Sequence, residues 1–297
     1  MTAAIPARPR RAARPGPRPT TKRRRVRLSP AGVAWTLAAL AVAVLWLVPL
    51  LWAFTTSLKP EAETTALPVR WLPDAPTLAA YAEVLGRGDI LRWLLNSTVV
   101  ATLVTALTLV CCALAAFGFS RTDFPGRRWC YAAFLAGILV PPQVLVVPLF
   151  NQMSALGLVD TYWGVALPQV AAPVMVFVLK RFFDGIPREY EEAARLDGAG
   201  HLRVLWSVVL PMSVPILSAV GIFTFVAAWN NFLWPFIVTT DPDLMTLPVG
   251  LGSVQGAYGI QYAENMAAAV LGAVPLLIVF AVLQRHVVRG VGDVGLR

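Results

Sequence analysis

The chain has 297 residues, of which 57% are apolar and 14% are charged, whereas charged residues make up about 25% of an ordinary soluble domain. Long stretches without a charged side chain, each of 19 or more residues, include 28–58, 93–120, 129–159, 161–179, 204–240 and 265–284. A helix needs about 20 mostly apolar residues to cross a membrane, so each stretch is a candidate span. This pattern excludes a soluble enzyme with one packed core. It also argues against an outer-membrane barrel, whose strands alternate apolar and polar residues.

The net charge of +9 is concentrated at the N-terminus, where ten of the 25 basic residues and no acidic residue lie in the first 27 positions. This segment is also rich in proline and has little apolar surface to bury. We therefore expect residues 1–31 to form a disordered, basic arm. Anchoring of the topology and contact with anionic membrane lipid explain such an arm better than binding of nucleic acid does.

The first apolar stretch is too long for a cleaved signal peptide, whose apolar region has about 7–15 residues. We therefore expect it to be retained as a span. The sequence as a whole predicts an all-α polytopic membrane protein with a transmembrane domain at 32–297. Its six transmembrane helices are expected at about 32–54, 94–118, 130–151, 162–180, 214–237 and 266–286.

The distribution of basic residues predicts the orientation of these spans. With the N-terminus inside, the cytoplasmic segments 1–31, 119–129, 180–213 and 285–297 carry 21 of the 25 lysines and arginines. Two of the three outside loops carry none. Because basic residues accumulate on the cytoplasmic side of membrane proteins, the sequence predicts six spans with both termini inside, the N-in/C-in topology.

Residues for catalysis, redox chemistry or metal binding are missing from the pattern. Cys111 and Cys112 are adjacent within the second expected span, and His201 and His286 are far apart, so no metal site is expected. None of the three lysines belongs to a phosphate-binding loop. The centres of the spans hold no ionisable residue that could couple transport to protons. We expect no catalytic residue and no cofactor in this chain, and an energy source in another subunit.

Prolines in or at the ends of the expected spans predict kinked or broken helices. Proline removes a backbone donor, and a helical bundle tolerates this where neighbours or water satisfy the freed carbonyl group. Kinked helices around a cavity suit a transport pathway. The prolines are Pro49, Pro141, Pro142, Pro148, Pro168, Pro173, Pro235 and Pro275.

The cytoplasmic loop at 181–213, called here the EAA segment, is the most patterned part of the sequence. Pro187 suits a first helical position, and the acidic residues that follow suit a helix N-terminus. We expect Glu191 to pair with Arg195 on this helix, which ends at a glycine turn near Asp197. A second helix is expected to carry one apolar face and to end at a proline; the face is formed by Leu202, Leu205, Trp206 and Val209. This arrangement suits docking of a soluble partner.

The segment contains Glu192-Ala193-Ala194, then Gly198 after three residues, then Val208-Val209-Leu210-Pro211 after nine more. This spacing resembles the EAA loop of ABC importer permeases, EAA-x3-G-x9-I-x-LP, with Val208 in place of isoleucine. The longer string 187–199 is similar to the version found in the carbohydrate-uptake subfamily. The resemblance extends over nearly the whole chain after the basic arm, including 56–59, 96–97, 115–121, 229–230 and 247–251. The tail at 292–297 departs from the string that is common in this family.

The resemblance implies a type I ABC importer permease with the MetI-like fold in the bacterial cytoplasmic membrane. Such a permease pairs with a second homologous permease, binds two ATP-binding cassette ATPases through the EAA loops, and receives sugar from an extracytoplasmic solute-binding protein. Ala193 and Ala194 would allow close approach of a partner, and Gly198 would permit the sharp turn. The residues implied in coupling are Glu192, Ala193, Ala194, Asp197, Gly198, Leu202, Trp206 and Pro211.

The expected substrate pathway rests on aromatic and amide side chains, which suit the apolar face and the hydroxyl groups of a sugar. Packing of tryptophan between helices accounts for the same residues equally well. The candidates are Trp229, Asn230, Asn231 and Trp234, with Gln143, Asn151 and Gln152 on the third span.

Two alternatives are weighed against the sugar permease. An ABC permease for amino acids or peptides would share the EAA loop, and only the extended string favours sugar. An ATP-independent channel or secondary transporter would need its own selectivity and coupling groups, which the spans do not offer.

Overall fold

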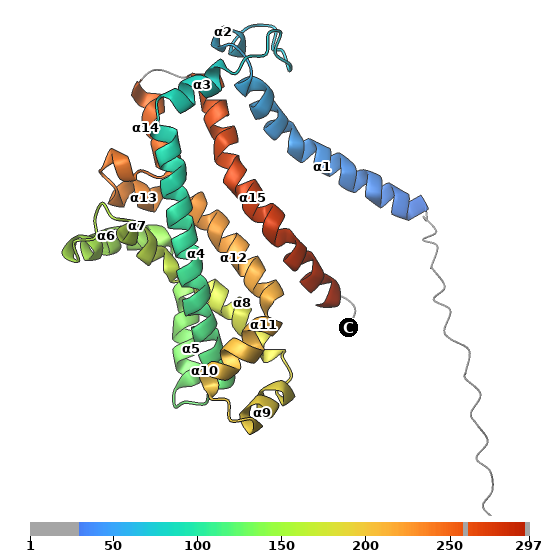
Figure 1. Ribbon diagram of the computed structural model, residues 1–297, viewed down its shortest axis with the longest axis vertical. Coiled ribbons are helices and arrows are strands. Elements are labelled where there is room, and N and C mark those ends of the chain that lie inside the picture. Colours follow the sequence, from blue (N-terminus) through green and yellow to red (C-terminus); the bar gives the residue numbers. More distant parts are fainter. Residues whose placement is uncertain (1–29, 258–260, 295–297) are drawn as a thin grey trace, which may run out of the picture. The chain divides into compact units, whose positions relative to one another are not determined.

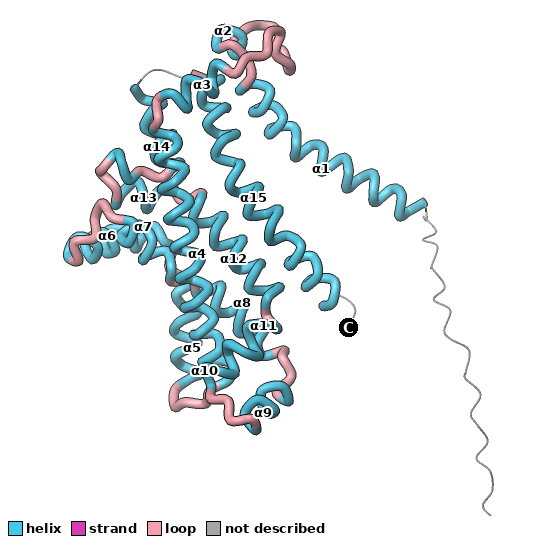
Figure 2. Tube along the Cα trace, viewed as in Figure 1, coloured by secondary structure: helices cyan, strands magenta, loops and turns pink. Residues whose placement is uncertain are grey.

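A computed structural model describes residues 30–257 and 261–294, with side chains placed for 31–253 and 261–282. The described part of the chain is helical and contains no strand (Figure 2). All but the last two residues of the expected basic arm lie outside it, as do the final three residues of the tail. The chain divides within its first helix into two compact units, residues 1–48 and 49–297.

The described residues form a succession of helices joined by turns and loops (Figure 1). The α-helices are α1 (Pro30–Ser57), α2 (Glu61–Thr64), α3 (Ala79–Gly86), α4 (Asp89–Arg121), α5 (Arg127–Ala136), α6 (Val146–Ala155), α7 (Tyr162–Val170), α8 (Pro173–Asp184), α9 (Glu189–Leu196), α10 (His201–Val204), α11 (Leu210–Met212), α12 (Val214–Trp229), α13 (Leu233–Val238), α14 (Leu247–Ala257) and α15 (Tyr262–Val294). Short 3-10 turns lie at Gly137–Leu139, Pro142–Leu145 and Pro242–Leu244, and a π-helical turn lies at Leu205–Val209.

Among the described residues, three helices are long and apolar enough to cross a membrane by themselves: α1, α4 and α15. Three further candidate spans exist if two helices bent at a short break count as one. These pairs are 127–139 with 142–155, 162–170 with 173–184, and 201–212 with 214–229, bent by 96°, 51° and 83°.

Two of the breaks follow directly from proline chemistry. Pro141 and Pro142 lack the amide hydrogens that would continue the helix from α5. Ala172, which precedes Pro173, has a non-helical backbone, and Pro173 then starts α8. In contrast, α1 and α15 continue through Pro49 and Pro275. The fifth expected span, 214–237, is also divided, because α12 ends at Trp229 and α13 begins at Leu233.

Helix α4 forms the centre of the unit at 49–297. It packs against α12, α8 and α7, while α15 packs against α12 and α3. One apolar core surrounds its first half and includes Val100, Val104 and Phe225. A second surrounds its last turns and includes Phe117 and Phe183. Helices α3 and α14 lie at the Asp89 end of α4, and α9 and α10 lie at its Arg121 end (Figure 1).

The Asp89 end of α4 is joined to the segment before α14 by a buried asparagine. The Asn96 amide donates hydrogen bonds to the carbonyls of Asp243 and Met245, each at 2.9 Å, and its oxygen accepts one from the Tyr162 hydroxyl at 2.6 Å. The adjacent Ser97 hydroxyl accepts from the Leu247 amide at 2.8 Å. These bonds satisfy backbone groups that regular helix would otherwise pair.

A second polar anchor lies between α6 and α7, outside the candidate spans. Asp160 adopts a left-handed backbone with φ of 54°, and its amide donates to the carbonyl of Val238. Its carboxylate accepts the Thr240 hydroxyl at 2.6 Å as well as the amides of Thr240 and Asp241. The Thr240 hydroxyl, followed by these amides, lowers the pKa of the Asp160 carboxyl below its usual value.

We predict that Asn96→Ala destabilises the folded chain by about 2–3 kcal/mol, because it leaves two carbonyl groups and a hydroxyl without their partner. Tyr162→Phe is the matched control, since it deletes one of the three bonds and should cost about 1 kcal/mol. Thermal unfolding of the detergent-solubilised protein measures both changes. Equal, small losses in the two variants would show that the asparagine does not hold the segment.

The lowered pKa of Asp160 predicts a pH-dependent contribution to stability. The contribution is fully present above the unfolded pKa of about 4 and is lost as the pH falls through the lower folded pKa. Asp160→Asn retains the size and the tolerance for positive φ but removes the charge. The thermal midpoint of wild type should exceed that of Asp160→Asn at neutral pH, and the two should converge as the pH falls below the unfolded pKa and through the lower folded pKa. A constant difference over this range would contradict the assignment.

Candidate functional site

The EAA segment folds as a helix, a glycine turn and a second helical stretch. Helix α9 carries Glu189, Glu191 and Glu192 in its first turn, where acidic side chains complement the helix dipole. The helix begins at Glu189, with Arg188 as its N-cap. Pro187 therefore precedes the helix, whereas the sequence predicted it as the first helical residue. It ends at Leu196 with Asp197 as C-cap, in agreement with the expected boundary.

Gly198 makes the turn that ends α9. Its φ is +84°, its amide donates to the carbonyl of Arg195, and the amide of Ala199 donates to the carbonyl of Ala194. A Cβ atom added at Gly198 would meet no atom within 4 Å. The position therefore requires glycine for its backbone conformation and not for lack of space.

The expected pair of Glu191 with Arg195 is wrong. Glu191 is 4% exposed, and its carboxylate lies 2.8 Å from Nε of Arg121, at the end of α4. The Arg121 guanidinium also donates to the carbonyls of Phe183 and Ile186, beyond the ion pair. The partner of Glu191 is seventy positions away in sequence, so a rule for neighbours on one helix could not find it.

The expected apolar face of the second helix is also wrong. Leu205 and Val209 are buried, but Leu202 and Trp206 are 64% and 60% exposed. The stretch begins as α10 and widens into a π-helical turn at Leu205–Val209, so the residues no longer follow the spacing of a regular α-helix. The buried pair packs into the core that surrounds the last turns of α4, and the exposed pair points away from it.

The EAA segment therefore has one accessible face and one buried side. The buried side, called here its base, includes Glu191, Leu205 and Val209. Seven of the eight residues implied in coupling are exposed: Glu192, Ala193, Asp197, Gly198, Leu202, Trp206 and Pro211. The eighth, Ala194, is half-buried against the same core. Sequence reasoning missed Tyr190 and Leu196, which are 55% and 90% exposed on α9. Large apolar side chains exposed together on a short loop are typical of a protein-binding surface.

The residues expected in the substrate pathway are not all accessible. Trp229 and Trp234 are buried in the core around the first half of α4. The indole of Trp234 donates to the carbonyl of Gly164 at 3.1 Å, and Trp229 stacks on Phe225. These two side chains therefore pack between helices in this chain.

The amide candidates lie at surfaces or at helix breaks. Asn231, between α12 and α13, donates to the side-chain oxygen of Gln169 on α7 at 2.8 Å. Gln169 was missed because it lies in a span where the sequence gives no further polar signal. Asn230 is exposed and donates to the carbonyl of Val226 in its own helix. The candidates of the third span, Gln143, Asn151 and Gln152, are exposed.

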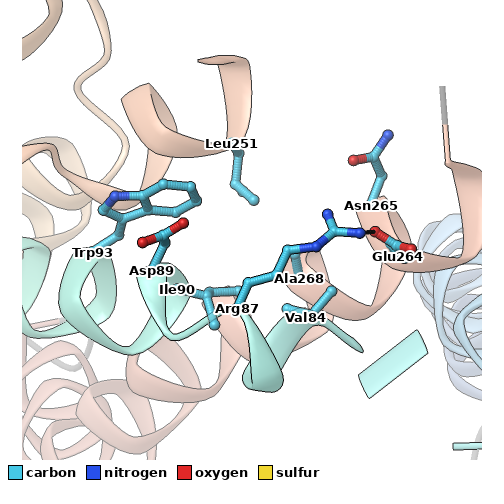
Figure 3. A pocket seen from close by; sticks show the side chains of 9 residues that line it. All are labelled: Val84, Arg87, Asp89, Ile90, Trp93, Leu251, Glu264, Asn265 and Ala268. Atoms are coloured by element: carbon cyan, nitrogen blue, oxygen red, sulfur yellow. Dashed lines mark ion pairs between the residues drawn. The ribbon is translucent and has the colours of Figure 1, made fainter. Parts of the chain in front are cut away.

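A pocket opens near the Asp89 end of α4, between α3, α14 and α15 (Figure 3). Its wall includes the Trp93 ring, and Glu264 forms a 2.9 Å ion pair with Arg87 across it. Gly250 lies against the ring, since a Cβ there would come within 2.1 Å of a ring carbon. The volume of about 40 Å³ is far below the roughly 300 Å³ of small ligand sites. The pocket is too small to hold a sugar.

Comparison with known proteins identifies the family to which the chain belongs. Residues 109–293 match the family described as "Binding-protein-dependent transport system inner membrane component". The chain belongs to this family. It is therefore a multi-pass permease of the inner membrane, with the helical MetI-like fold.

Relatives match over most of their own length. The chain is 38% identical to the sulfoquinovosyl glycerol transport system permease protein of Agrobacterium fabrum, over 88% of this chain and 92% of the relative. It is 37% identical to the diacetylchitobiose uptake system permease protein of Streptomyces coelicolor, over 85% and 86%.

A solved structure supports the fold independently. It is the crystal structure of a bacterial ABC transporter involved in the import of the acidic polysaccharide alginate. The permease and a chain of that transporter superpose with a TM-score of 0.77 at 22% identity, covering 86% of this chain and 95% of the other.

Two glycines of the EAA segment provide a matched test of its turn. Gly198 and Gly200 both have open space at the Cβ position, but only Gly198 has positive φ. We predict that Gly198→Ala lowers the stability by about 1–2 kcal/mol through backbone strain, whereas Gly200→Ala is tolerated. Thermal unfolding of the two purified variants measures the difference. Equal midpoints for the two variants would refute the role of the left-handed backbone.

Proposed function

We propose that the chain is the permease subunit of an ABC importer for a sugar or oligosaccharide, and that the EAA segment couples it to ATPase subunits. The observation that supports coupling most is the accessible face of α9 and α10 above its buried base. Two relatives support the substrate class, because their names describe transport of sulfoquinovosyl glycerol and uptake of diacetylchitobiose. The carbohydrate-type string at 187–199 agrees with them.

The proposed partners follow from this function. A second homologous permease would complete the pathway, two ATP-binding cassette ATPases would bind the EAA segments, and an extracytoplasmic solute-binding protein would deliver the sugar. Glu192 and Asp197 would offer charge to a basic groove, and Leu202 and Trp206 would offer apolar anchors. The chain itself would be non-catalytic and would hold no cofactor, with ATP hydrolysed by the partners.

We place the substrate pathway along the amide side chains rather than on the buried tryptophans. Asn231 lies where the fifth expected span is interrupted, and Asn230 beside it is exposed. Interrupted helices expose backbone and amide groups that can bind sugar hydroxyls. Gln143 and Asn151 would line the opposite part of the pathway, while Trp229 and Trp234 would support it from behind.

We further propose that six spans cross the membrane, with both termini in the cytoplasm. They are α1, α4, α15, the bent pairs within 127–155 and 162–184, and the interrupted segment 214–237. The EAA segment and the connection at 122–126 then face the cytoplasm. The segments that contain α2, α3 and the start of α14 face outward, where the solute-binding protein would dock.

This orientation predicts the result of reporter fusions along the chain. Fusions near residues 125 and 195 should report a cytoplasmic location, and fusions near residues 75 and 250 should report an external one, because basic residues are retained inside. Alkaline phosphatase and fluorescent-protein fusions measure the two sides. An external signal near residue 195 would contradict both the six-span topology and the coupling role.

The coupling role predicts that Glu192→Lys loses the ATPase subunits, because the reversed charge would meet a basic groove at close range. Truncating or reversing such contacts costs about 2–5 kcal/mol of binding free energy, a loss of roughly 30-fold or more in affinity. Glu189→Lys is the matched control, since Glu189 is exposed in the same helical turn but lies outside the motif. Pull-down of ATPase subunits by each variant from membranes of equal permease content measures the effect. Equal retention in both variants would refute the docking surface.

A further inference from the structure

Arg121 occupies an unusual position at the last residue of α4. Its side chain is 4% exposed, and that of its ion-pair partner Glu191 is 5% exposed. A carboxylate compensates its charge, and two backbone carbonyls accept hydrogen bonds from its Nη2 atom; these partners come from two sequence segments. The carboxylate comes from the first turn of α9, and the carbonyls come from Phe183, in the last turn of α8, and Ile186, just beyond it. Arg121 therefore holds α4 to the base of the EAA segment.

Neighbouring polar contacts strengthen the junction between α4 and α8. The Ser120 hydroxyl donates to the Asp184 carboxylate at 2.6 Å, and Lys180 donates to the other oxygen of the same group at 2.8 Å. Phe117 of α4 and Phe183 of α8 belong to one apolar core. These contacts join the Arg121 end of α4 to α8 and α9, so we expect a displacement of α8 and α9 to displace this end of α4 as well.

The opposite end of α4 is held just as specifically. Asn96 bonds the carbonyls of Asp243 and Met245, and Ser97 bonds the amide of Leu247. Arg92, one turn earlier, forms an ion pair with the side chain of Asp243. Residues 243–247, which lead into α14, are therefore held to α4 by side chains on two successive turns.

Helix α4 is suited to connect these two junctions. It is 33 residues long, about 50 Å at 1.5 Å per residue. Of the three unbroken candidate spans in the described residues, α4 is the one without an internal proline. Three other candidate spans bend by 51° to 96°. A continuous helix with polar contacts at both ends transmits displacement better than a helix that can hinge at a break.

We propose that α4 is the rod that transmits movement of the EAA segment to residues 243–247, and that the Arg121–Glu191 ion pair is the positioning contact that engages it. This inference rests on the proposed function, in which ATPases bind the EAA segment. Closure of the ATPases displaces α9, Glu191 carries Arg121 with it, and α4 shifts the external segment that precedes α14. Neither residue needs to touch substrate or nucleotide.

The test uses the complete transporter in lipid nanodiscs and the double variant Arg121→Gln/Glu191→Gln. Either single variant leaves a buried charge without its partner and can fail to fold for that reason. The double variant removes both charges and keeps side chains of similar length. Asp123→Asn is the control, because it breaks an exposed ion pair with Arg127 near the same end of α4.

The probe is Mg-ATP with vanadate, which traps the closed ATPases, and the measurement is hydrogen exchange in peptides that cover 240–250. In wild type and Asp123→Asn, trapping should change exchange in these peptides. In the double variant, with ATPase subunits retained and basal ATP hydrolysis preserved, that change should fall at least about fivefold. A merely structural pair would leave the change intact.

Two outcomes overturn the inference: a change of wild-type size in the double variant, or the absence of any change in wild type. Failure of the proposed function has a different signature. In that case the wild-type permease would retain no ATPase subunits before any exchange is measured.

Discussion

The buried guanidinium of Arg121 is the interaction on which the arrangement around the EAA segment depends. It draws the first turn of α9, the end of α8 and the end of α4 to one point. Loss of one partner from a buried ion pair costs about 3–5 kcal/mol, because the remaining charge has no compensation. The burial of Glu191 in turn directs Glu192 outward, since adjacent residues on a helix face different directions. The base of the segment therefore determines which residues a partner can reach.

Polar groups at helix ends and breaks shape the rest of the unit. A buried backbone group released from a helix requires another partner, above all within a membrane. Asn96 supplies such partners near α14, Asp160 supplies them at the start of α7, and Ser213 donates to the carbonyl of Val209 between α11 and α12. These bonds allow broken helices to coexist with a continuous α4. The fold thus combines one rigid axis with several segments that have built-in bends.

Much of this architecture could be predicted from the sequence, because the dominant signals are local. Gaps between charges located the apolar helices, and the glycine after α9 predicted a turn that the structure confirms at Gly198. Contacts between distant segments could not be predicted in this way. The partner of Glu191 lies on another helix, and the π-helical turn separates Leu202 and Trp206 from Leu205 and Val209. Likewise, composition alone could not distinguish a tryptophan in the pathway from Trp234, which is packed against Gly164.

The central claim is that the accessible face of the EAA segment docks an ATPase subunit while its base stays fixed to α4. A cryo-electron microscopy structure of the assembled transporter tests this claim most directly. The account predicts that Leu202 and Trp206 are buried against the ATPase and that Arg121 still contacts Glu191. A structure in which the ATPases bind elsewhere and the EAA segment faces solvent would contradict it.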